Sequence, residues 1–272
     1  MDIKKIQTKL KTSLFGTNIY YKESLDSTNA YTMRLAKEGA PEGTVVLTEF
    51  QESGRGRHNR PWFSSHGENL LMSILLRPEL EVEMVQKIAL ATATILIDSI
   101  KDFYKNRKIK VSELEVKWPN DILLNGKKLG GILAESKLKN KTMEALVIGI
   151  GLNVNSTQKE FPKDIRDSAI SLKDVIGIDT SIENLLTFFL KRFEQNYMKY
   201  ERTNYAGVVE NWKKYCHQFG ESIIIKQPIS EETGVFHDVS NEGYLMYKTR
   251  AGKIKKLIAG FIMRKQKDAV SD

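Results

Sequence analysis

Residues 53–60 combine three arginines and two glycines in a stretch that has almost no apolar side chains. Arginine suits the oxygens of phosphates and carboxylates, because its planar guanidinium group donates paired hydrogen bonds. Gly54 and Gly56 let the backbone approach a ligand closely and adopt positive φ angles. We therefore predict a mobile loop at residues 51–60, the arginine loop, that becomes ordered over a bound anion. Taken alone, the pattern is as typical of an RNA-binding arginine–glycine segment or of a solvated turn.

Two lysines stand on either side of a predicted hairpin, Lys117 before it and Lys128 just after its turn. The turn sequence Asn125-Gly126 is the strongest short signal for a tight hairpin, and we expect both lysines on paired strands, pointing into one pocket. Two ammonium groups beside a phosphoryl centre would offset the charge that builds up during a displacement. Asp121 could orient an incoming amine or hold Mg²⁺ through its water shell. A hairpin that carries lysines is also a common solvated surface.

Glycines mark two further strands. Gly130 and Gly131 inside a predicted strand indicate that a ligand lies close to the backbone. Residues 149–155 begin with Gly-Ile-Gly, but Val154 stands where a dinucleotide-binding fingerprint needs Gly or Ala, and no helix follows. The sequence also lacks the GxxxxGK[ST] motif of a P-loop. Any ATP must therefore be held by a different architecture.

The histidines and the cysteine are not spaced for a metal site. The four histidines are scattered at positions 58, 66, 217 and 237, and structural or solvated roles are favoured for them. The single cysteine, Cys216, excludes an internal disulfide and fits a reducing cytoplasm. Its neighbours Tyr215 and His217 do not by themselves activate a thiol, so a structural role is favoured over catalysis.

The composition is that of a soluble globular protein: 41% of the 272 residues are hydrophobic and 28% are charged. No run approaches the ~18 apolar residues of a membrane helix, and residues 1–10 lack the apolar core of a signal peptide. We expect a cytoplasmic protein with no membrane partner. The net charge of +8 suits a partner or substrate rich in phosphates or carboxylates, but it does not argue for nucleic acid alone.

The elements that must position these residues form an α+β pattern with a mixed sheet. Strands are expected at residues 18–23, 44–50, 70–76, 113–117, 122–124, 127–136 and 145–154. Helices are expected from the caps at residues 27–29 to Gly39, and at 83–104, 182–200 and 208–215. After residue 219 the pattern changes to short strands at 222–227, 232–238, 243–248 and 253–258, which predict a small β-barrel. The expected division is a domain at 1–219, a barrel at 220–265 and a solvated tail at 266–272.

Together these segments resemble the biotin protein ligase family, in its monofunctional type without an N-terminal DNA-binding domain. The resemblance runs from about residue 18 to 262, and the combination of its motifs is specific. The motifs, in order, are Asp26-Ser27-Thr28-Asn29, Gly54-Arg55-Gly56-Arg57, Lys117-Trp118-Pro119-Asn120-Asp121, Lys128-Leu129-Gly130-Gly131-Ile132-Leu133 and Gly149-Ile150-Gly151-Leu152-Asn153. The family fold is a catalytic α+β domain followed by an SH3-like barrel.

The resemblance also implies a site. Biotin is expected to contact Ser27, Thr28, Asn29, Gln51, Gly54, Arg55, Arg57, Lys128, Gly130 and Gly131. ATP and the adenylate are expected to contact Arg55, Arg57, Trp62, Lys117, Asn120, Lys128 and Asn153, with Asn153 at the adenine. The expected catalytic residues are Lys128, Arg55, Asp121 and Lys117. No metal ligand is certain, although Asp121 could contact the Mg²⁺ that accompanies ATP.

The implied activity is the ATP-dependent formation of biotinyl-5'-AMP and the transfer of biotin to a lysine of a biotin carboxyl carrier protein. The carrier would be that of acetyl-CoA carboxylase or a related carboxylase, and the enzyme a monomer or a homodimer. Some family members carry an N-terminal winged helix of ~60 residues that binds DNA. Only about 18 residues precede the first strand here, so neither a repressor function nor a nucleic-acid partner is expected.

One departure from the family and two alternatives stay open. Asn59 stands where the family often has glycine, which leaves the dynamics of the arginine loop undetermined. A lipoate or octanoate ligase shares the catalytic fold, but its loop pattern differs from GRGR followed by KWPND. A nucleic-acid-binding module would also suit the basic charge and the arginine loop. Against it, aromatic residues do not cluster beside that loop as stacking platforms would.

Overall fold

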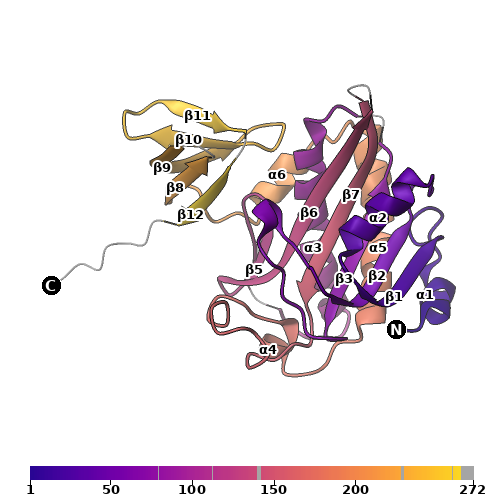
Figure 1. The fold of residues 1–272 in the computed structure, drawn as a ribbon. Helices are drawn as coiled ribbons and strands as arrows, with labels where there is room; N and C mark the ends of the chain where they lie inside the picture. Colours follow the sequence, from indigo (N-terminus) through magenta and orange to yellow (C-terminus); the bar gives the residue numbers. More distant parts are fainter. Residues whose placement is uncertain (79, 112, 140–141, 228–229, 259, 265–272) are drawn as a thin grey trace.

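Two sheets organise the chain, one of seven strands and a separate one of five (Figure 1). The computed structural model describes residues 1–264 except 79, 112, 140–141, 228–229 and 259, so the predicted tail at 266–272 lies outside the described residues. The large sheet has the order β1-β2-β3-β7-β6-β5-β4, and only the pair β1–β2 is parallel. Its strands are β1 (Ile19–Leu25), β2 (Val45–Gln51), β3 (Asn69–Leu76), β4 (Leu114–Lys117), β5 (Asp121–Leu124), β6 (Lys127–Lys139) and β7 (Thr142–Asn153).

Helices cover both faces of the large sheet (Figure 1). On one face lies α2 (Thr28–Lys37), and on the other lie α3 (Met84–Lys105) and α5 (Ile182–Arg202). The strand β3 shows the division, because alternate side chains of a strand point to opposite faces. Met72 and Ile74 belong to the main core with α3 and α5, whereas Leu75 joins a smaller cluster with Ala36 of α2.

The remaining helices are short: α1 (Ile3–Leu10), a 3-10 turn η1 (Arg57–Asn59), α4 (Leu172–Ile176) and α6 (Val208–Lys213). The helix α1 was not predicted, because its lysines obscure the apolar pattern of the sequence. Only two apolar residues, one turn apart, are buried in it. Ile6 and Leu10 are 1% and 2% exposed, and the helix packs against α5. An apolar pair at i and i+4 is enough for a short helix when a neighbouring helix completes its core.

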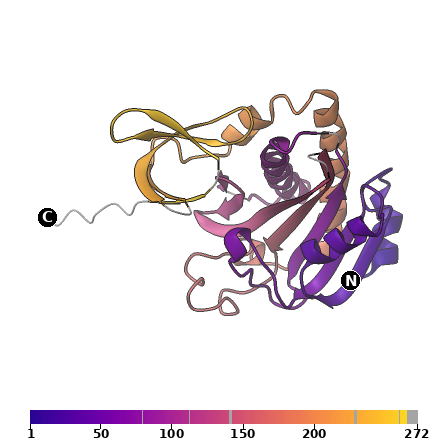
Figure 2. The same cartoon turned by 45° about the horizontal axis from the view of Figure 1, so that its top comes forward.

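The C-terminal sheet lies beside the β5 end of the large sheet (Figure 2). It contains β8 (Ser222–Gln227), β9 (Ser230–Val239), β10 (Leu245–Thr249), β11 (Ile254–Leu257) and β12 (Phe261–Arg264), all antiparallel, in the order β11-β10-β9-β8-β12. The prediction of a mixed α+β fold is confirmed, and an antiparallel sheet lies where the small SH3-like barrel was predicted. Over the described residues the hydrogen bonds give an open sheet and not a closed barrel.

Two further properties concern the whole described chain. Among the described residues, none of the helices combines the length and the apolar content that a membrane crossing requires. Cys216 is buried, and burial raises the pKa of its thiol to about 12. At neutral pH the thiol is therefore protonated, which supports the structural role predicted for it.

Candidate active site

A cavity lies on the α2 face of the large sheet, and its floor is formed by strands that lack side chains there. In the register of the sheet, Gly131 stands opposite Gly151, and Leu133 stands opposite Gly149. Directly opposed residues share one face, so these glycines carry no side chain there, and the space above Gly149 and Gly151 is taken up by Asn29 and Trp62. A methyl group on Gly149 would sit 2.1 Å from Oδ1 of Asn29, and one on Gly151 would sit 2.6 Å from the Trp62 ring.

At the α2 end the cavity is lined by four polar residues, which we call the neutral pocket: Ser27, Thr28, Asn29 and Gln51. The Oε1 atom of Gln51 accepts hydrogen bonds from the backbone N–H of Thr28 (2.8 Å) and from its hydroxyl (3.1 Å). This leaves the Gln51 Nε2 group as a donor. Ser27 caps α2, and its side chain accepts from the backbone of Ala30. The neutral pocket therefore lies at the positive end of a helix dipole.

Ser73 of β3 supports the neutral pocket through hydrogen bonds from the sheet. The Ser73 hydroxyl lies 2.8 Å from the Thr28 hydroxyl and 2.6 Å from Oδ1 of Asn29, and its side chain is fully buried. The Asn29 amide group donates to the Leu133 carbonyl (3.2 Å) and to Glu135 (2.7 Å). Buried polar groups with complete hydrogen bonding are rigid, so these side chains keep their orientation.

The arginine loop folds over the same cavity as a small hairpin of its own. The N–H of Gly56 donates to the Arg60 carbonyl, and the N–H of Trp62 donates to the Gly54 carbonyl, both at 2.8 Å. Asn59 adopts the left-handed region with φ 56°, as glycine would. Asparagine is one of the residues that enters this region most readily. These bonds and angles give the loop a defined hairpin geometry over the cavity.

The arginines of the loop meet both charged and aromatic groups. Arg55 donates from Nη2 to Oε1 of Glu135 at 3.1 Å. The Arg57 guanidinium is half-buried and lies 5.9 Å from the centre of the Trp118 ring. Burial lowers the pKa of Arg57, and Asp121 acts in the opposite direction. Arginine titrates far above neutral pH, so Arg57 remains a cation.

The lysines approach the cavity from the edge of the large sheet. Lys117 of β4 stands opposite Asp121 of β5, and Asp121 stands opposite Gly131. The Nζ of Lys128 lies 2.7 Å from Oδ1 of Asp121 and 5.6 Å from the centre of the Trp62 ring. The prediction that the two lysines lie on paired strands is wrong, because two tight hairpins in succession place β5 between β4 and β6.

A β-bulge explains why Lys128 still faces the cavity. The register of β5 and β6 shifts between Ile122 and Leu123, so that Gly130 pairs with Ile122 but Lys128 pairs with Leu123. A bulge inserts one residue and turns the following side chains to the other face. Here Leu129 is fully buried, and Lys128 lines the cavity together with Gly131.

Most of the predicted site residues converge on this one cavity. It is lined by Ser27, Thr28, Asn29, Gln51, Arg55, Arg57, Trp62, Lys117, Asn120, Asp121, Lys128 and Gly131. Gly54 and Gly130 lie behind the lining. Asn153 is buried, and its amide group donates to the carbonyl of Ile170 (3.0 Å). We call Arg55, Arg57, Lys117 and Lys128 the cation group.

The structure adds residues that the sequence patterns did not single out. Ser73 and Glu135 hold the lining from outside it. The C-terminal sheet also takes part, because Ile262 of β12 lines the cavity. Its position is supported by Trp118, whose Nε1 donates to the Gly243 carbonyl at 3.0 Å. A serine inside the apolar strand LLMSILL was the one signal in the sequence.

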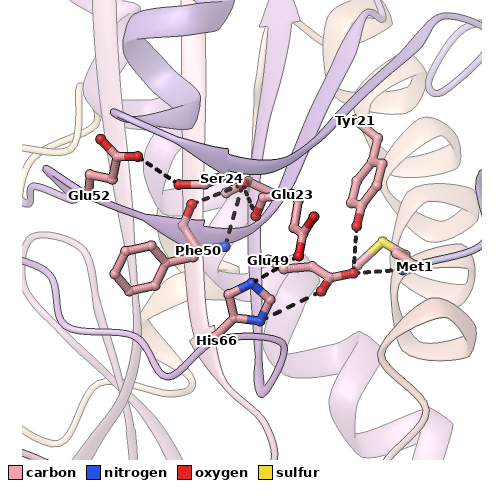
Figure 3. Close-up of polar contacts among 9 residues, drawn as sticks. Met1, Tyr21, Glu23, Ser24, Glu49, Phe50, Glu52 and His66 are labelled. Carbon is pink, nitrogen blue, oxygen red and sulfur yellow. Dashed lines mark hydrogen bonds and ion pairs between the residues drawn. The ribbon is translucent and has the colours of Figure 1, made fainter.

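A second polar cluster, outside the cavity lining, joins the N-terminus to β1 and β2 (Figure 3). Glu49 of β2 accepts from the Met1 amino group and from the Tyr21 hydroxyl, both at 2.6 Å. His66 reaches Glu49 at 3.8 Å and Glu23 at 3.7 Å, and it stacks on Phe50. Within the described part of the chain, no three His, Cys, Asp or Glu side chains are grouped to hold a metal ion. The cluster therefore fastens the N-terminus to the strand that carries Gln51.

Comparisons with known proteins agree with one another. The model of the Biotin/lipoate A/B protein ligase family matches residues 21–153. The bifunctional ligase/repressor BirA of Bacillus subtilis is 32% identical over 257 residues, which cover 94% of this chain and 77% of that protein. The biotin–[acetyl-CoA-carboxylase] ligase of Paracoccus denitrificans is 28% identical over 229 residues, 84% of this chain and 93% of that one. The biotin protein ligase of Aquifex aeolicus, solved in complex with biotin and ATP, superposes with a TM-score of 0.74 at 26% identity, covering 92% of this chain and 100% of that one.

Proposed function

Because the chain belongs to the biotin/lipoate A/B protein ligase family, we propose that it is a biotin protein ligase. It would join biotin to AMP with release of pyrophosphate from ATP, and then pass biotin to a lysine of a carrier protein. The observation that carries this proposal is one cavity in which the neutral pocket adjoins the cation group over a floor of glycines. Such a cavity suits a ligand that is neutral and polar at one end and anionic at the other.

In this assignment the neutral pocket holds the ureido ring of biotin. A ureido group presents both donors and acceptors, and the pocket offers hydroxyls and the Nε2 donor of Gln51. The biotin tail runs along Gly131, beside the side chains of Asp121 and Lys128. The carboxylate then reaches Lys128 and Arg55. Asn153 is proposed at the adenine, although its amide group is used here by the Ile170 carbonyl.

The first step is governed by charge. The carboxylate of biotin and the phosphates of ATP are anions, so attack of the carboxylate oxygen on the α-phosphorus is repelled in water. The cation group neutralises this repulsion and aligns the two groups for in-line displacement. Attack forms the mixed anhydride and expels pyrophosphate. Lys128 is the proposed principal catalytic residue, because its side chain lies beside Gly131 of the floor, with Cε 3.7 Å from where a methyl group on Gly131 would stand.

Mg²⁺ would enter with ATP. Only Asp121 of the cavity lining carries a carboxylate, and Mg²⁺ commonly uses one or two carboxylates together with substrate phosphates. Asp121 therefore suits an ion held mainly by ATP and its own water shell. When bound, the ion would supply further positive charge at the phosphates.

In the second step, the transfer of biotin to the carrier, Asp121 is proposed to act on the incoming amine. The arginine loop and Trp62 cover the anhydride and exclude water, until the carrier lysine enters from the open side. Asp121 would orient its amine and take a proton, while nitrogen attacks the carbonyl carbon and AMP leaves. The proposed partner is the biotin carboxyl carrier domain of acetyl-CoA carboxylase or a related carboxylase. We further propose that residues 1–219 form the catalytic domain and that the C-terminal sheet completes its cavity through Ile262.

ATP–pyrophosphate exchange tests the proposal directly. The purified chain is incubated with Mg²⁺, ATP and labelled pyrophosphate, with biotin, lipoate or octanoate in parallel and no carrier. Exchange that depends on biotin alone is expected. Exchange with lipoate or octanoate in place of biotin would show that the chain is a lipoate or octanoate ligase. Exchange with none of the three acids would contradict the ligase function.

A further inference from the structure

Glu135 lies outside the cavity lining but contacts two residues that belong to it. It follows Gly131 and Leu133 on the same face of β6, at the far end of the cavity floor. Its Oε1 accepts from Nη2 of Arg55 at 3.1 Å, and its Oε2 accepts from Nδ2 of Asn29 at 2.7 Å. One carboxylate thus joins the arginine loop to the neutral pocket.

The two partners differ in how firmly they are held. Asn29 is 3% exposed, and its Oδ1 and both amide hydrogens are used by Ser73, Leu133 and Glu135. Arg55 lies on a loop, and its side chain is 42% exposed. A rigid carboxylate can therefore fix the position of Arg55. A guanidinium has five N–H donors, so the bond from Nη2 to Glu135 leaves further donors for a bound anion.

We propose that Glu135 is the positioning residue of the arginine loop: it holds Arg55 against the neutral pocket and so keeps the loop closed over the cavity. Glu135 touches no reacting atom and acts through Arg55. The proposal rests on the proposed ligase function for its effect on activity, but its effect on the loop is independent of that function.

Limited digestion with trypsin measures loop closure without any substrate. The bond after Arg57 lies in the half-buried part of the loop, so its cleavage requires the loop to open. We expect Glu135→Ala to accelerate this cleavage about tenfold, which corresponds to the loss of one charge-assisted contact. Glu135→Gln keeps the shape and the bond to Asn29, so it should preserve the fold and show a smaller acceleration. Lys137→Gln is the matched control, because it removes an ion pair with Glu144 (2.6 Å) from the same face of β6.

A double-mutant cycle with Arg55→Ala separates positioning from general loosening. If Glu135 acts through Arg55, adding Glu135→Ala to Arg55→Ala changes the cleavage after Arg57 no further. Cleavage at the wild-type rate in both Glu135 variants, or full additivity in the cycle, would overturn the proposal.

Steady-state exchange gives the second readout. The KM for biotin should rise about tenfold in Glu135→Ala, with kcat nearly unchanged, because the residue positions a group before the reaction. A fall in kcat alone, at an unchanged KM, would contradict the positioning role. If the chain fails to support exchange with any acid but its loop still opens in Glu135→Ala, the ligase function fails and the role of Glu135 in the loop stands.

Discussion

At the α2 end of the cavity the polar side chains are neutral, buried and hydrogen-bonded to one another, whereas at the β4–β6 end they are charged and partly exposed. Thr28 and Ser73 are 4% and 0% exposed. The side chains of Lys128 and Asp121 are 41% and 28% exposed, and they form an ion pair with each other. Neutral groups in a buried network cannot be moved without loss of hydrogen bonds, while exposed ion pairs can exchange partners at little cost.

This difference follows from what each end has to do in the proposed reaction. The neutral pocket must discriminate one ring system from others, and discrimination needs groups of fixed geometry. The cation group must bind substrate phosphates, then lose pyrophosphate and AMP, so its charges must change partners twice. Asp121 pairs with Lys128 between these events, whereas Glu135 holds Arg55 throughout.

Removal of Lys128 should give the largest effect. Lys128→Ala is expected to lower the kcat of biotin-dependent exchange roughly a thousandfold, the scale of losing one charge-stabilising group at a reacting centre. Binding of biotin should weaken far less than kcat falls, because the neutral pocket and Arg55 keep their contacts with it. The measurements are exchange and equilibrium dialysis with biotin.

Lys127→Ala is the control for this variant, because Lys127 lies on the same strand but outside the cavity lining. Its exchange rate should match that of the unmodified chain. Normal adenylate formation by Lys128→Ala would remove Lys128 from the catalytic role.

Ser73→Ala should affect the opposite end. It leaves Oδ1 of the buried Asn29 without its donor, which costs about 1–3 kcal/mol and should raise the KM for biotin roughly 10- to 100-fold. The KM for ATP should stay nearly constant, since no group of the cation group is touched. Ser99→Ala is the control, because that buried hydroxyl only bonds the Ile95 carbonyl within α3. Equal increases in both KM values would show that the two ends are not independent.

Gly54→Ala should disturb the arginine loop between the neutral pocket and the cation group. A methyl group there would lie 2.8 Å from the Trp62 carbonyl oxygen and 3.1 Å from Nε2 of Gln51. Crowding of this kind costs about 1–3 kcal/mol, so we expect roughly tenfold faster release of biotinyl-AMP into solution. Release is followed by chromatography of the free adenylate during turnover.

Gly56→Ala gives the comparison within the same loop. Its methyl group would meet nothing closer than the Arg60 carbonyl at 3.7 Å, an ordinary contact. The leak should therefore be smaller than in Gly54→Ala. Identical leaks in both variants would mean that loss of glycine flexibility, and not the contact with Trp62, opens the loop.

The sequence patterns predicted the ends of the cavity better than its supports. The arginine loop, Lys117 and Lys128 could be identified because glycines, arginines and a hairpin turn leave local signals. The direction of the Lys128 side chain could not be predicted from the sequence. A bulge at Leu129 determines it, and no residue type indicates a bulge. Glu135 was missed for a different reason: its partner Arg55 is 80 residues away, and only the fold brings them together.

The same contrast applies to the fold. The strands of the large sheet were predicted from their β-branched and apolar runs, and their bounds differ by only a few residues from those observed. The order of the strands in the sheet was not predicted. There β7 lies between β3 and β6, and β5 lies between β4 and β6, the strands that carry Lys117 and Lys128. Sequence periodicity describes one element at a time, whereas the order of strands depends on how all of them share a core.

The smallest effect is expected from Glu49, which supports the strand of Gln51 from outside the cavity. Hydrogen bonds from the Met1 amino group and from Tyr21 hold the pKa of Glu49 below its ordinary value of 4.5. A lowered pKa means that the charged carboxylate stabilises the fold above pH 4.5, and that this stabilisation is lost as the pH falls through the lowered pKa. Glu49→Gln should therefore cost about 1 kcal/mol at pH 7, or about 3 °C in Tm, and less at pH 3.

Thermal unfolding across this pH range checks the effect, with Glu23→Gln as the control. The Glu23 side chain is 78% exposed, and its ion-pair partner His66 lies 3.7 Å away, so its loss should leave Tm unchanged at either pH. The KM for biotin in Glu49→Gln should equal that of the unmodified chain, because Gln51 keeps its bonds to Thr28. A large rise in that KM would mean that the neutral pocket depends on the N-terminal cluster and is not rigid by itself.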